Sequence, residues 1–335
     1  MTKKETNIND IKFIDLFAGI GGFHFALHRQ GSKCVFASEI DQQARLTYKY
    51  NFQKISPDLF EEDLFVDKNL FNKDITKIDP KDIPEHDILC GGFPCQPFSI
   101  AGYRKGFDDK DRGDLIFNII EIIKIKQPKV IFLENVKNLY SHDKGETYNY
   151  IKELIKKQGY FVKEKVLNTM EYGNLPQNRE RLYILGFKNK DEHDKFEFPK
   201  PQKLTQKLID ILEKTEVDNY YYYNDKPLFE KIKNDIIKEN TAYQWRRVYT
   251  RENKSEVCPT LTANMGTGGH NVPIIKDKKG IRKLVPMECI RLQGFPPNFT
   301  FPKTVNRSNQ YKQAGNSISL PVVEAIAKNI LQAIL

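Results

Sequence analysis

The first 187 residues alternate between two patterns of apolar and polar positions. Short apolar runs predict buried strands at 12–17, 33–39, 87–90, 129–135, 160–168 and 181–187. Helical spacing between these runs predicts helices at 23–31, 41–51, 114–128 and 147–159. Strands that alternate with helices of this length favour an α/β fold built on a doubly wound, parallel sheet.

This alternation stops after residue 187. Residues 188–281 are rich in lysine, asparagine and tyrosine, and their short runs predict a separate, smaller domain. Residues 320–335 return to a clean amphipathic helix, which Pro321 opens.

Composition narrows the classes to which the chain can belong. Lysine and arginine outnumber aspartate and glutamate by 53 to 44, which favours a polyanionic partner or serves solubility alone. The five cysteines form no C-x-x-C pair and the six histidines show no ligand spacing, which argues against a disulfide framework and any metal site. We see no signal peptide and no run approaching a membrane span, so we expect a soluble protein of a reducing compartment.

A glycine-rich turn follows the first predicted strand and opens the first helix. Gly19, Gly21 and Gly22 lack Cβ atoms, so a ligand can approach the backbone near a helix N-terminus. Glu39 ends the second strand and is either a ribose ligand or a surface carboxylate. Asp74 is a weaker candidate for the next strand end. The G-x-G-G spacing does not favour a dinucleotide.

The stretch "GGFPCQPFS" at 91–99 holds one cysteine between two prolines. Prolines fix φ and remove backbone donors, so this segment is a shaped loop. Taken alone, Cys95 is either a small buried thiol beneath a turn or a nucleophile.

Six motifs occur in a fixed order along nearly the whole chain: "FIDLFAGIGGF", "GGFPCQPFS", "ENV", "QNRERLYILGF", "RLQGFP" and "QAGNSISLPV". Together they resemble the DNA cytosine-5 methyltransferases of bacterial restriction–modification systems. The resemblance implies a Rossmann-like, S-adenosylmethionine-dependent methyltransferase fold with a doubly wound, mixed sheet. It places a catalytic domain at 1–187 plus 313–335, a target-recognition domain at 188–281 and a connecting hinge at 282–312. Residues 55–70 are an insertion relative to the shortest members.

The same resemblance assigns the chemistry. Cys95 is the nucleophile that adds to C6 of cytosine, because C5 is otherwise a poor nucleophile. Glu134 protonates or hydrogen-bonds N3, Arg181 contacts O2, and Arg179 braces the loop. Either arginine is otherwise a solvated surface cation, and Glu134 a structural acid at a strand end.

The expected cofactor is S-adenosylmethionine, which leaves as S-adenosylhomocysteine. The resemblance, with the strand-end pattern, places it against Phe17, Ala18, Gly19, Gly21, Gly22, Glu39, Ile40, Asp74, Ile75, Pro94, Asn316 and Ser317. Asn316 and Ser317 otherwise form an ordinary turn and helix cap.

The expected substrate is double-stranded DNA, from which the target base must be flipped out. The segment 99–113 could close over that base, or be a disordered surface loop. The expected DNA-binding residues are Ser99, Arg104, Arg112, Arg246, Arg247, Arg251, Thr260 and Thr262, among which arginine forks can read guanine. A solvated basic loop is the alternative for the recognition segment.

Two other functions remain open at this point. One is an RNA cytosine-5 methyltransferase, and the other is a non-catalytic protein that binds DNA or S-adenosylmethionine. The family also implies a cytoplasmic monomer and a cognate restriction endonuclease with which no direct contact is expected.

Overall fold

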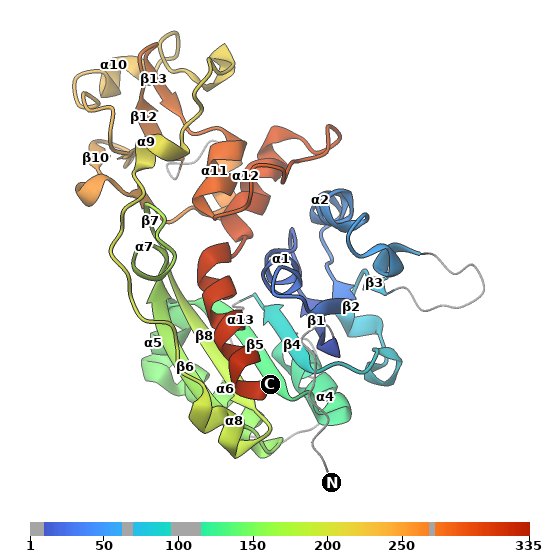
Figure 1. Cartoon of the computed structure of the whole chain (residues 1–335). Coiled ribbons are helices and arrows are strands. Elements are labelled where there is room, and N and C mark those ends of the chain that lie inside the picture. The colour runs from blue at the N-terminus through green and yellow to red at the C-terminus, as the bar shows by residue number, and fades with distance from the viewer. Residues whose placement is uncertain (1–9, 62–69, 95–114, 268–271) are drawn as a thin grey trace.

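The computed structural model describes residues 10–61, 70–94, 115–267 and 272–335. Its main element is a seven-stranded sheet in the order β3-β2-β1-β4-β5-β8-β6 (Figure 1). These strands are β1 (Lys12–Leu16), β2 (Lys33–Ser38), β3 (Phe71–Asn72), β4 (Ile88–Gly92), β5 (Val130–Val136), β6 (Phe161–Asn168) and β8 (Glu180–Phe187). The described ranges leave Cys95, Ser99, Arg104 and Arg112 outside.

The sheet is mixed, as the family resemblance implies. β1 to β5 pair in parallel, whereas β8 pairs antiparallel with both β5 and β6. The strand–helix alternation alone predicts a fully parallel sheet, and that prediction is wrong for β8. An antiparallel β8 is possible because the turn from β6 through a short helix lets the chain return directly beside it.

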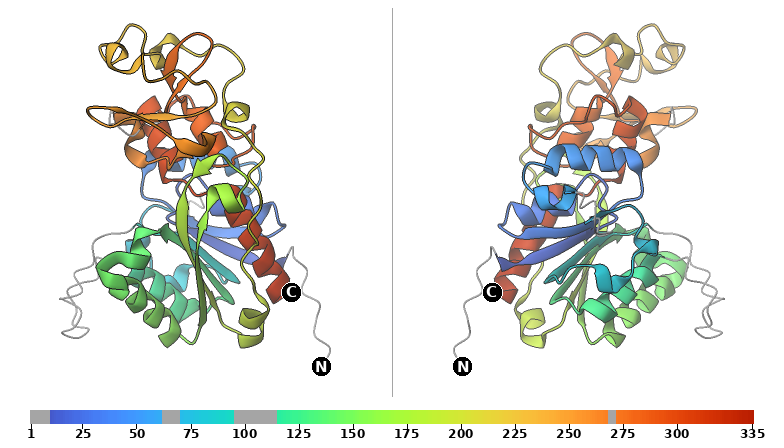
Figure 2. Two further views of the ribbon diagram at one scale, coloured as in Figure 1. Left: turned by 90° about the vertical axis from the view of Figure 1, so that its left-hand side faces the viewer. Right: turned by 90° about the vertical axis from the view of Figure 1, so that its right-hand side faces the viewer.

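Helices cover both faces of this sheet (Figure 2). The helices of the first half are α1 (Gly22–His28), α2 (Gln42–Phe52), α4 (Leu115–Lys126), α5 (Asn138–Ser141), α6 (Glu146–Lys157), α7 (Thr169–Tyr172) and α8 (Lys190–Lys195). On β1, Phe13 packs in the core that contains α1, α2 and α13 (Leu320–Ile334), whereas Ile14 packs in the core that contains α4 and α6. The central strands are therefore apolar on both faces, which explains their continuous apolar runs.

A smaller four-stranded sheet lies apart from the main one, in the order β10-β9-β12-β13. It is built from β9 (Tyr243–Trp245), β10 (Thr250–Glu252), β12 (Ile274–Lys276) and β13 (Ile281–Lys283), with α9 (Leu208–Ile211) and α10 (Phe229–Ile232) nearby. Tyr243, Ile274 and Ile281 share a separate apolar cluster with Ile232 and Ile236. This cluster gives the smaller sheet a core of its own.

Two connections tie the smaller sheet to the larger one. β7 (Gln177–Asn178) pairs in parallel with β11 (Cys258–Pro259). The chain then passes through α11 (Pro286–Leu292) and α12 (Arg307–Asn316) into α13, which packs against α1. The end of the described chain therefore lies beside its beginning (Figure 1).

One described stretch, Arg307–Ile334, is long and apolar enough to cross a membrane by length and composition alone. Within it, 61% of the apolar window is buried inside the protein. α13 is amphipathic and packs its apolar side on the sheet, so the stretch has the character of a core helix.

Candidate active site and nucleic-acid groove

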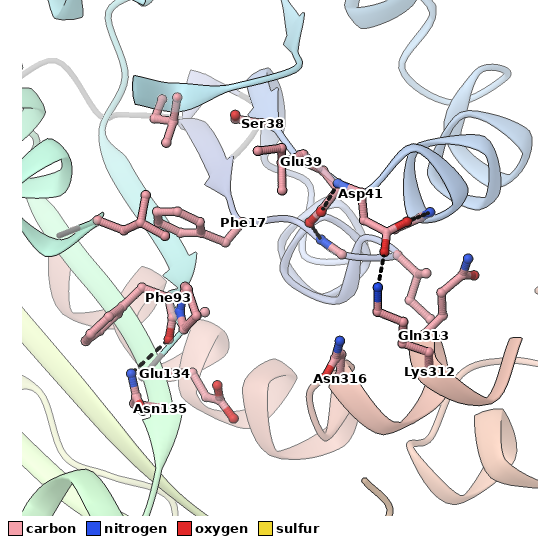
Figure 3. A pocket seen from close by; sticks show the side chains of 18 of the residues that line it. Phe17, Ser38, Glu39, Asp41, Phe93, Glu134, Asn135, Lys312, Gln313 and Asn316 are labelled. Carbon is pink, nitrogen blue, oxygen red and sulfur yellow. Dashed lines mark hydrogen bonds and ion pairs between the residues drawn. The ribbon is translucent and has the colours of Figure 1, made fainter. Parts of the chain in front are cut away.

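The carboxyl ends of β1, β2, β4 and β5 border a cavity of about 720 Å³ (Figure 3). Ligands of open α/β sheets occupy this edge, where the strand order changes direction. The predicted cofactor residues that line the cavity are Phe17, Gly19, Glu39, Ile40, Asp74, Ile75, Pro94 and Asn316. Of the predicted catalytic residues, Glu134, Arg179 and Arg181 line the same cavity.

The turn after β1 brings backbone to the cavity wall. Phe17 and Gly19 both have positive φ, at 54° and 55°, so the chain leaves the strand through two left-handed residues. No atom lies within 4 Å of the place where a Cβ on Gly19 would sit. Gly19 therefore leaves open space beside the cavity.

Gly21 and Gly22 have a different reason for lacking a side chain. A Cβ on Gly21 would lie 2.2 Å from the ring of Phe52, and one on Gly22 would lie 2.3 Å from Ile318. Neither residue lines the cavity, and neither does Ala18, whose N–H donates to the carbonyl of Ser38 at 2.9 Å. Gly21 and Gly22 thus let α1 pack closely against its neighbours, and Ala18 ties the turn to the end of β2.

Glu39 is fixed in place by backbone donors. The N–H groups of Gly19 and Asp41 donate to its two carboxylate oxygens, each at 2.7 Å. Burial raises the pKa of Glu39, and the two backbone hydrogen bonds oppose that rise. Next to it, the apolar side chain of Ile40 is 72% exposed, so an acceptor and an apolar surface lie side by side.

Asp74 lies at the entrance to a 3-10 turn that begins at Ile75. One carboxylate oxygen accepts from the backbone N–H and the hydroxyl of Thr76, at 3.1 and 2.7 Å. The hydrogen bond from the Thr76 hydroxyl is the main reason why the pKa of Asp74 is lowered. Asp74 is thus a charged helix cap that also faces the cavity.

α12 closes the cavity from the other side. The ammonium of Lys312 pairs with Asp41 at 2.5 Å, and the carbonyl oxygen of the Gln313 side chain accepts from Thr47 at 2.7 Å. Both contacts join α12 to α2, and Asn316 follows at the cavity wall (Figure 3). Ser317 is buried one residue beyond and does not line the cavity.

The end of the cavity beside β5 and β8 contains a buried carboxylate beside a guanidinium. The Nε of Arg181 lies 3.1 Å from Oε1 of Glu134, and Glu134 is 8% exposed. Burial raises the pKa of Glu134, while Arg181 and then Arg179 act against the rise. A carboxyl group in this environment can hold a proton at a higher pH than an exposed one.

Asn135, beside Glu134, positions the segment that leads towards Cys95. Its side-chain N–H donates to the carbonyl of Phe93 at 2.9 Å, so β5 holds the backbone just before Pro94 (Figure 3). Pro94 lies at the cavity wall and the described segment ends there.

Arg179 turns away from solvent and is 2% exposed. It donates to the carbonyl of Leu261 at 2.9 Å, to that of Gly315 at 3.2 Å and to that of Ser317. Burial and the neighbouring Arg181 lower its pKa to about 9. Arg179 thus joins backbone segments that lie far apart in the sequence.

A second cavity, of about 570 Å³, separates the smaller sheet from β7. Arg246, Arg251, Thr260 and Thr262 line it together with Gln244. Arg251 is the cross-strand partner of Gln244 and Arg246 lies two residues beyond, so the three share one face of the hairpin. We call this cavity the recognition groove.

Arg247 lies outside the recognition groove, at the exposed turn of the β9–β10 hairpin. Its φ is 64°, and Val248 beside it is 84% exposed. The structure therefore separates Arg247 from Arg246 and Arg251, which the sequence treats alike.

A family model described as C-5 cytosine-specific DNA methylase matches residues 11–332. The chain belongs to this family. It is accordingly a DNA cytosine-5 methyltransferase, and the family implies S-adenosylmethionine as the methyl donor.

Similar proteins span nearly the full chain. Type II methyltransferase M.Bsp6I of Bacillus sp. (strain RFL6) is 46% identical over 97% of this chain and 100% of its own length. Type II methyltransferase M.HhaI of Haemophilus parahaemolyticus is 38% identical over 98% of this chain and 96% of its own. The crystal structure of S. pombe Dnmt2 methyltransferase superposes with a TM-score of 0.72 at 22% identity, covering 97% of this chain and 99% of that one, which supports the fold.

The residues at the first cavity fit the methyl donor of this DNA methylase family. The open space at Gly19 suits the chain of the donor that carries the sulfonium, and the fixed carboxylate of Glu39 suits its ribose. The exposed apolar surface of Ile40 suits its flat base. Among the described residues, no group of three or more His, Cys, Asp or Glu is placed to hold a metal ion.

Some site residues are not among those that the sequence predicted. Asp41, Phe93, Lys312 and Gln313 line the cavity. Gln313 stands inside the quoted motif "QAGNSISLPV" and Asp41 follows Glu39 by two, so nearness to a motif was the available signal. Gln244 precedes the predicted Arg246 by two residues, which was the available signal, whereas a strand of three residues is too short to show a period.

Proposed function

We propose that the enzyme transfers a methyl group to C5 of a specific cytosine in double-stranded DNA, after that base is flipped out and Cys95 adds to its C6. The observation that carries this proposal is the Glu134–Arg181 pair, which shares one cavity with Gly19, Glu39 and Asn316. A donor site and a polar base site in one cavity are what a transfer between them requires.

The donor supplies an electrophilic methyl group when bound. Glu39 binds the ribose hydroxyls, the turn at Gly19 leaves room for the chain that carries the sulfonium, and Asn316 closes the opposite wall. Asp74 and Ile75 lie where the adenine end would lie. Ala18, Gly21, Gly22 and Ser317 support this wall by packing, because none of them lines the cavity.

The base is activated by Cys95, Glu134 and Arg181. The thiolate of Cys95 forms a bond to C6, while the proton of Glu134 goes to N3, so that C5 becomes nucleophilic. After methyl transfer, water takes the proton from C5, the C5–C6 double bond re-forms as the thiolate of Cys95 leaves C6, and N3 returns its proton to Glu134. Arg181 keeps Glu134 in place through their ion pair and contacts O2 of the flipped base.

DNA is held between the two sheets. Residues 188–281 form the target-recognition domain and 282–312 connect it to the catalytic domain, 1–187 plus 313–335. Arg246, Arg251, Thr260 and Thr262 face DNA from the recognition groove, and Arg247 reaches it from the hairpin turn. Ser99, Arg104 and Arg112 contact phosphates near the flipped base.

The biological setting is a restriction–modification system, in which methylation protects host DNA from a cognate endonuclease. The similar proteins are named as type II methyltransferases, which supports this setting. The enzyme acts in the cytoplasm as a monomer and needs no contact with the endonuclease.

The test is a covalent trap. A duplex with 5-fluorocytosine at the target should form a stable adduct, because fluorine at C5 cannot leave as a proton. Cys95→Ala should abolish the adduct, and an adduct that persists in this variant would remove Cys95 from the mechanism. Transfer of a radiolabelled methyl group to duplex DNA but not to transfer RNA should distinguish this function from that of an RNA methyltransferase. Methyl transfer to either substrate would exclude a non-catalytic binding protein.

A further inference from the structure

A buried network of polar side chains lies between the recognition groove and the cofactor cavity. Its members are Gln177, Arg179 and Gln293, and none of them is more than 2% exposed. Burying three long polar side chains is unfavourable unless their hydrogen bonds are made, so the network strongly constrains the segments that it joins.

Leu261 is the point where this network holds the recognition side. Its N–H donates to Oε1 of Gln177 at 3.2 Å, and its carbonyl accepts from Arg179 at 2.9 Å. Thr260 and Thr262, on either side, line the recognition groove. The N–H and the carbonyl of Leu261, which lies between two groove residues, are therefore both held by the short stretch 177–179.

The network holds the cofactor side in the same way. Arg179 donates to the carbonyls of Gly315 and Ser317, which flank the cavity residue Asn316. The side chain of Gln293 donates to the carbonyl of Ala314 at 2.8 Å, and its own carbonyl oxygen accepts from Gln177 at 3.3 Å.

Close packing reinforces these hydrogen bonds. A Cβ on Gly315 would lie 2.2 Å from the carbonyl carbon and oxygen of Thr262, so the two backbones touch without a side chain between them. A shift of the loop around Leu261 must therefore move the carbonyls around Asn316, or break several buried hydrogen bonds at once.

From this geometry we infer that Gln177, Arg179 and Gln293 are positioning residues that couple DNA recognition to cofactor binding. The donor, or its product, orders the segment 314–317, and the network passes that order to the groove residues beside Leu261. Coupling between two ligands is reciprocal, so DNA must raise the affinity for the cofactor by the same factor. The inference rests on the proposed function, because it requires both sites to be occupied as described.

The coupling factor is measured with S-adenosylhomocysteine and a duplex whose target has been mapped by 5-methylcytosine sequencing. Titration calorimetry gives the dissociation constant of S-adenosylhomocysteine with and without the duplex. In the unmodified enzyme the duplex should tighten binding by about 5-fold or more. In Gln293→Met and Gln177→Met this ratio should fall towards one.

Tyr160→Phe is the matched control. The Tyr160 hydroxyl donates to the carbonyl of Pro128 at 2.7 Å in a buried site outside the network, so this variant also loses one buried hydrogen bond. It should keep the full coupling factor. A network with a purely structural role would lower stability in all three variants and leave the ratio unchanged.

Hydrogen exchange tests the inference in the unmodified enzyme, even if the two glutamine variants do not fold. S-adenosylhomocysteine alone should slow exchange of the Leu261 amide, while amides of the β9–β10 hairpin should not change. The inference is overturned if the cofactor protects 314–320 but not Leu261, or if a folded glutamine variant keeps the full ratio. Failure of S-adenosylhomocysteine to bind would instead overturn the proposed function.

Discussion

The cofactor cavity and the recognition groove hold their polar side chains in different ways. Around the cavity, Glu39, Glu134 and Arg179 are buried or held by hydrogen bonds and ion pairs within the protein. In the groove, Arg246 has one side-chain bond, at 3.0 Å to Gln244, and the side chain of Arg251 has no bond to a described residue.

This difference is what the proposed function requires of each site. Groups that stabilise a transition state work best when their orientation is fixed beforehand, because reorganisation then costs nothing during the reaction. Side chains that read DNA exchange their hydrogen bonds to water for hydrogen bonds to the bases, so DNA supplies the acceptors that the protein does not. Substitutions around the cavity should therefore disturb the protein or the chemistry, and substitutions in the groove should disturb DNA binding.

The largest effect should come from Glu134→Gln. Glutamine keeps the shape of the side chain but cannot deliver a proton, so single-turnover methyl transfer should slow by about 10²–10⁴-fold. The affinity for DNA should change little. The control is Glu180→Gln, because Glu180 is a partly exposed residue that pairs with Lys137 at 2.8 Å near the same site. An equal loss in both variants would mean that Glu134 contributes only charge or packing.

Two glycines of the turn beside the cofactor cavity, Gly19 and Gly21, can be compared with each other. Gly21→Ala should lower the free energy of unfolding by about 1–3 kcal/mol from contact with Phe52, and by about 1–2 kcal/mol more from its left-handed backbone. Gly19→Ala should show the backbone cost alone, together with weaker binding of S-adenosylhomocysteine. Urea unfolding and calorimetry measure the two effects, and equal stability losses would refute this division of roles.

The groove should separate two kinds of arginine. Arg246→Ala should cost roughly 1–3 kcal/mol in binding and relax discrimination at one base pair, because Arg246 is oriented by Gln244 inside the groove. Arg247→Ala should weaken binding to all duplexes about equally and reduce the salt slope by about one. The measurement is binding to duplexes that differ at single flanking bases. Uniform loss in both variants would leave the base-reading role to Arg251 or to the segment 262–271.

The smallest effect is a change in the pH dependence of stability, and it arises only from residues near the cofactor cavity. Asp15 and His24 are both fully buried behind the glycine turn, where the backbone N–H of His24 donates to the carboxylate of Asp15 at 3.3 Å. Burial raises the pKa of Asp15 and lowers the pKa of His24. The raised acid stabilises the fold at low pH and loses that effect as pH rises, whereas the depressed histidine stabilises it above about pH 6.5 and loses that effect as pH falls.

The two contributions have opposite signs between about pH 4 and 6.5, the ordinary pKa values of an aspartate and a histidine in the unfolded chain, and each changes the free energy of unfolding by at most about 1.4 kcal/mol per pH unit. Relative to the unmodified enzyme, Asp15→Asn should lose stability as pH falls through this window, and His24→Gln should gain it. Denaturant midpoints at the two pH values provide the measurement. Parallel curves for all three proteins would show that neither group changes its protonation on folding.

The sequence predicted the strands and their ends well where long apolar runs were present. The carboxyl ends of β1, β2 and β5 followed from those runs, and so did the placement of Gly19, Glu39 and Glu134 at one edge. The direction of β8 could not be read in the same way, because a strand that is apolar on both faces looks alike in either orientation.

Contacts between distant segments were also beyond the sequence. The packing of Gly21 on Phe52 depends on how α2 lies against α1, and the pairing of Lys312 with Asp41 depends on how α12 lies against α2. In the smaller domain, strands of three residues carry too little periodicity to assign a face. The family resemblance supplied the roles there, but it did not distinguish Arg246 from Arg247.

The joining of α2 to α12 also sets the time at which this enzyme can become active. Thr47 of α2 and Gln313 of α12, which share a buried hydrogen bond, are separated by 266 positions in the chain. At about 5–20 residues per second, a ribosome needs on the order of 10–50 s to make the second partner after the first. A nascent chain that already carries the glycine turn and Glu134 still lacks one wall of the donor site. Incomplete translation products should therefore be unable to methylate DNA, even when their recognition residues have been made.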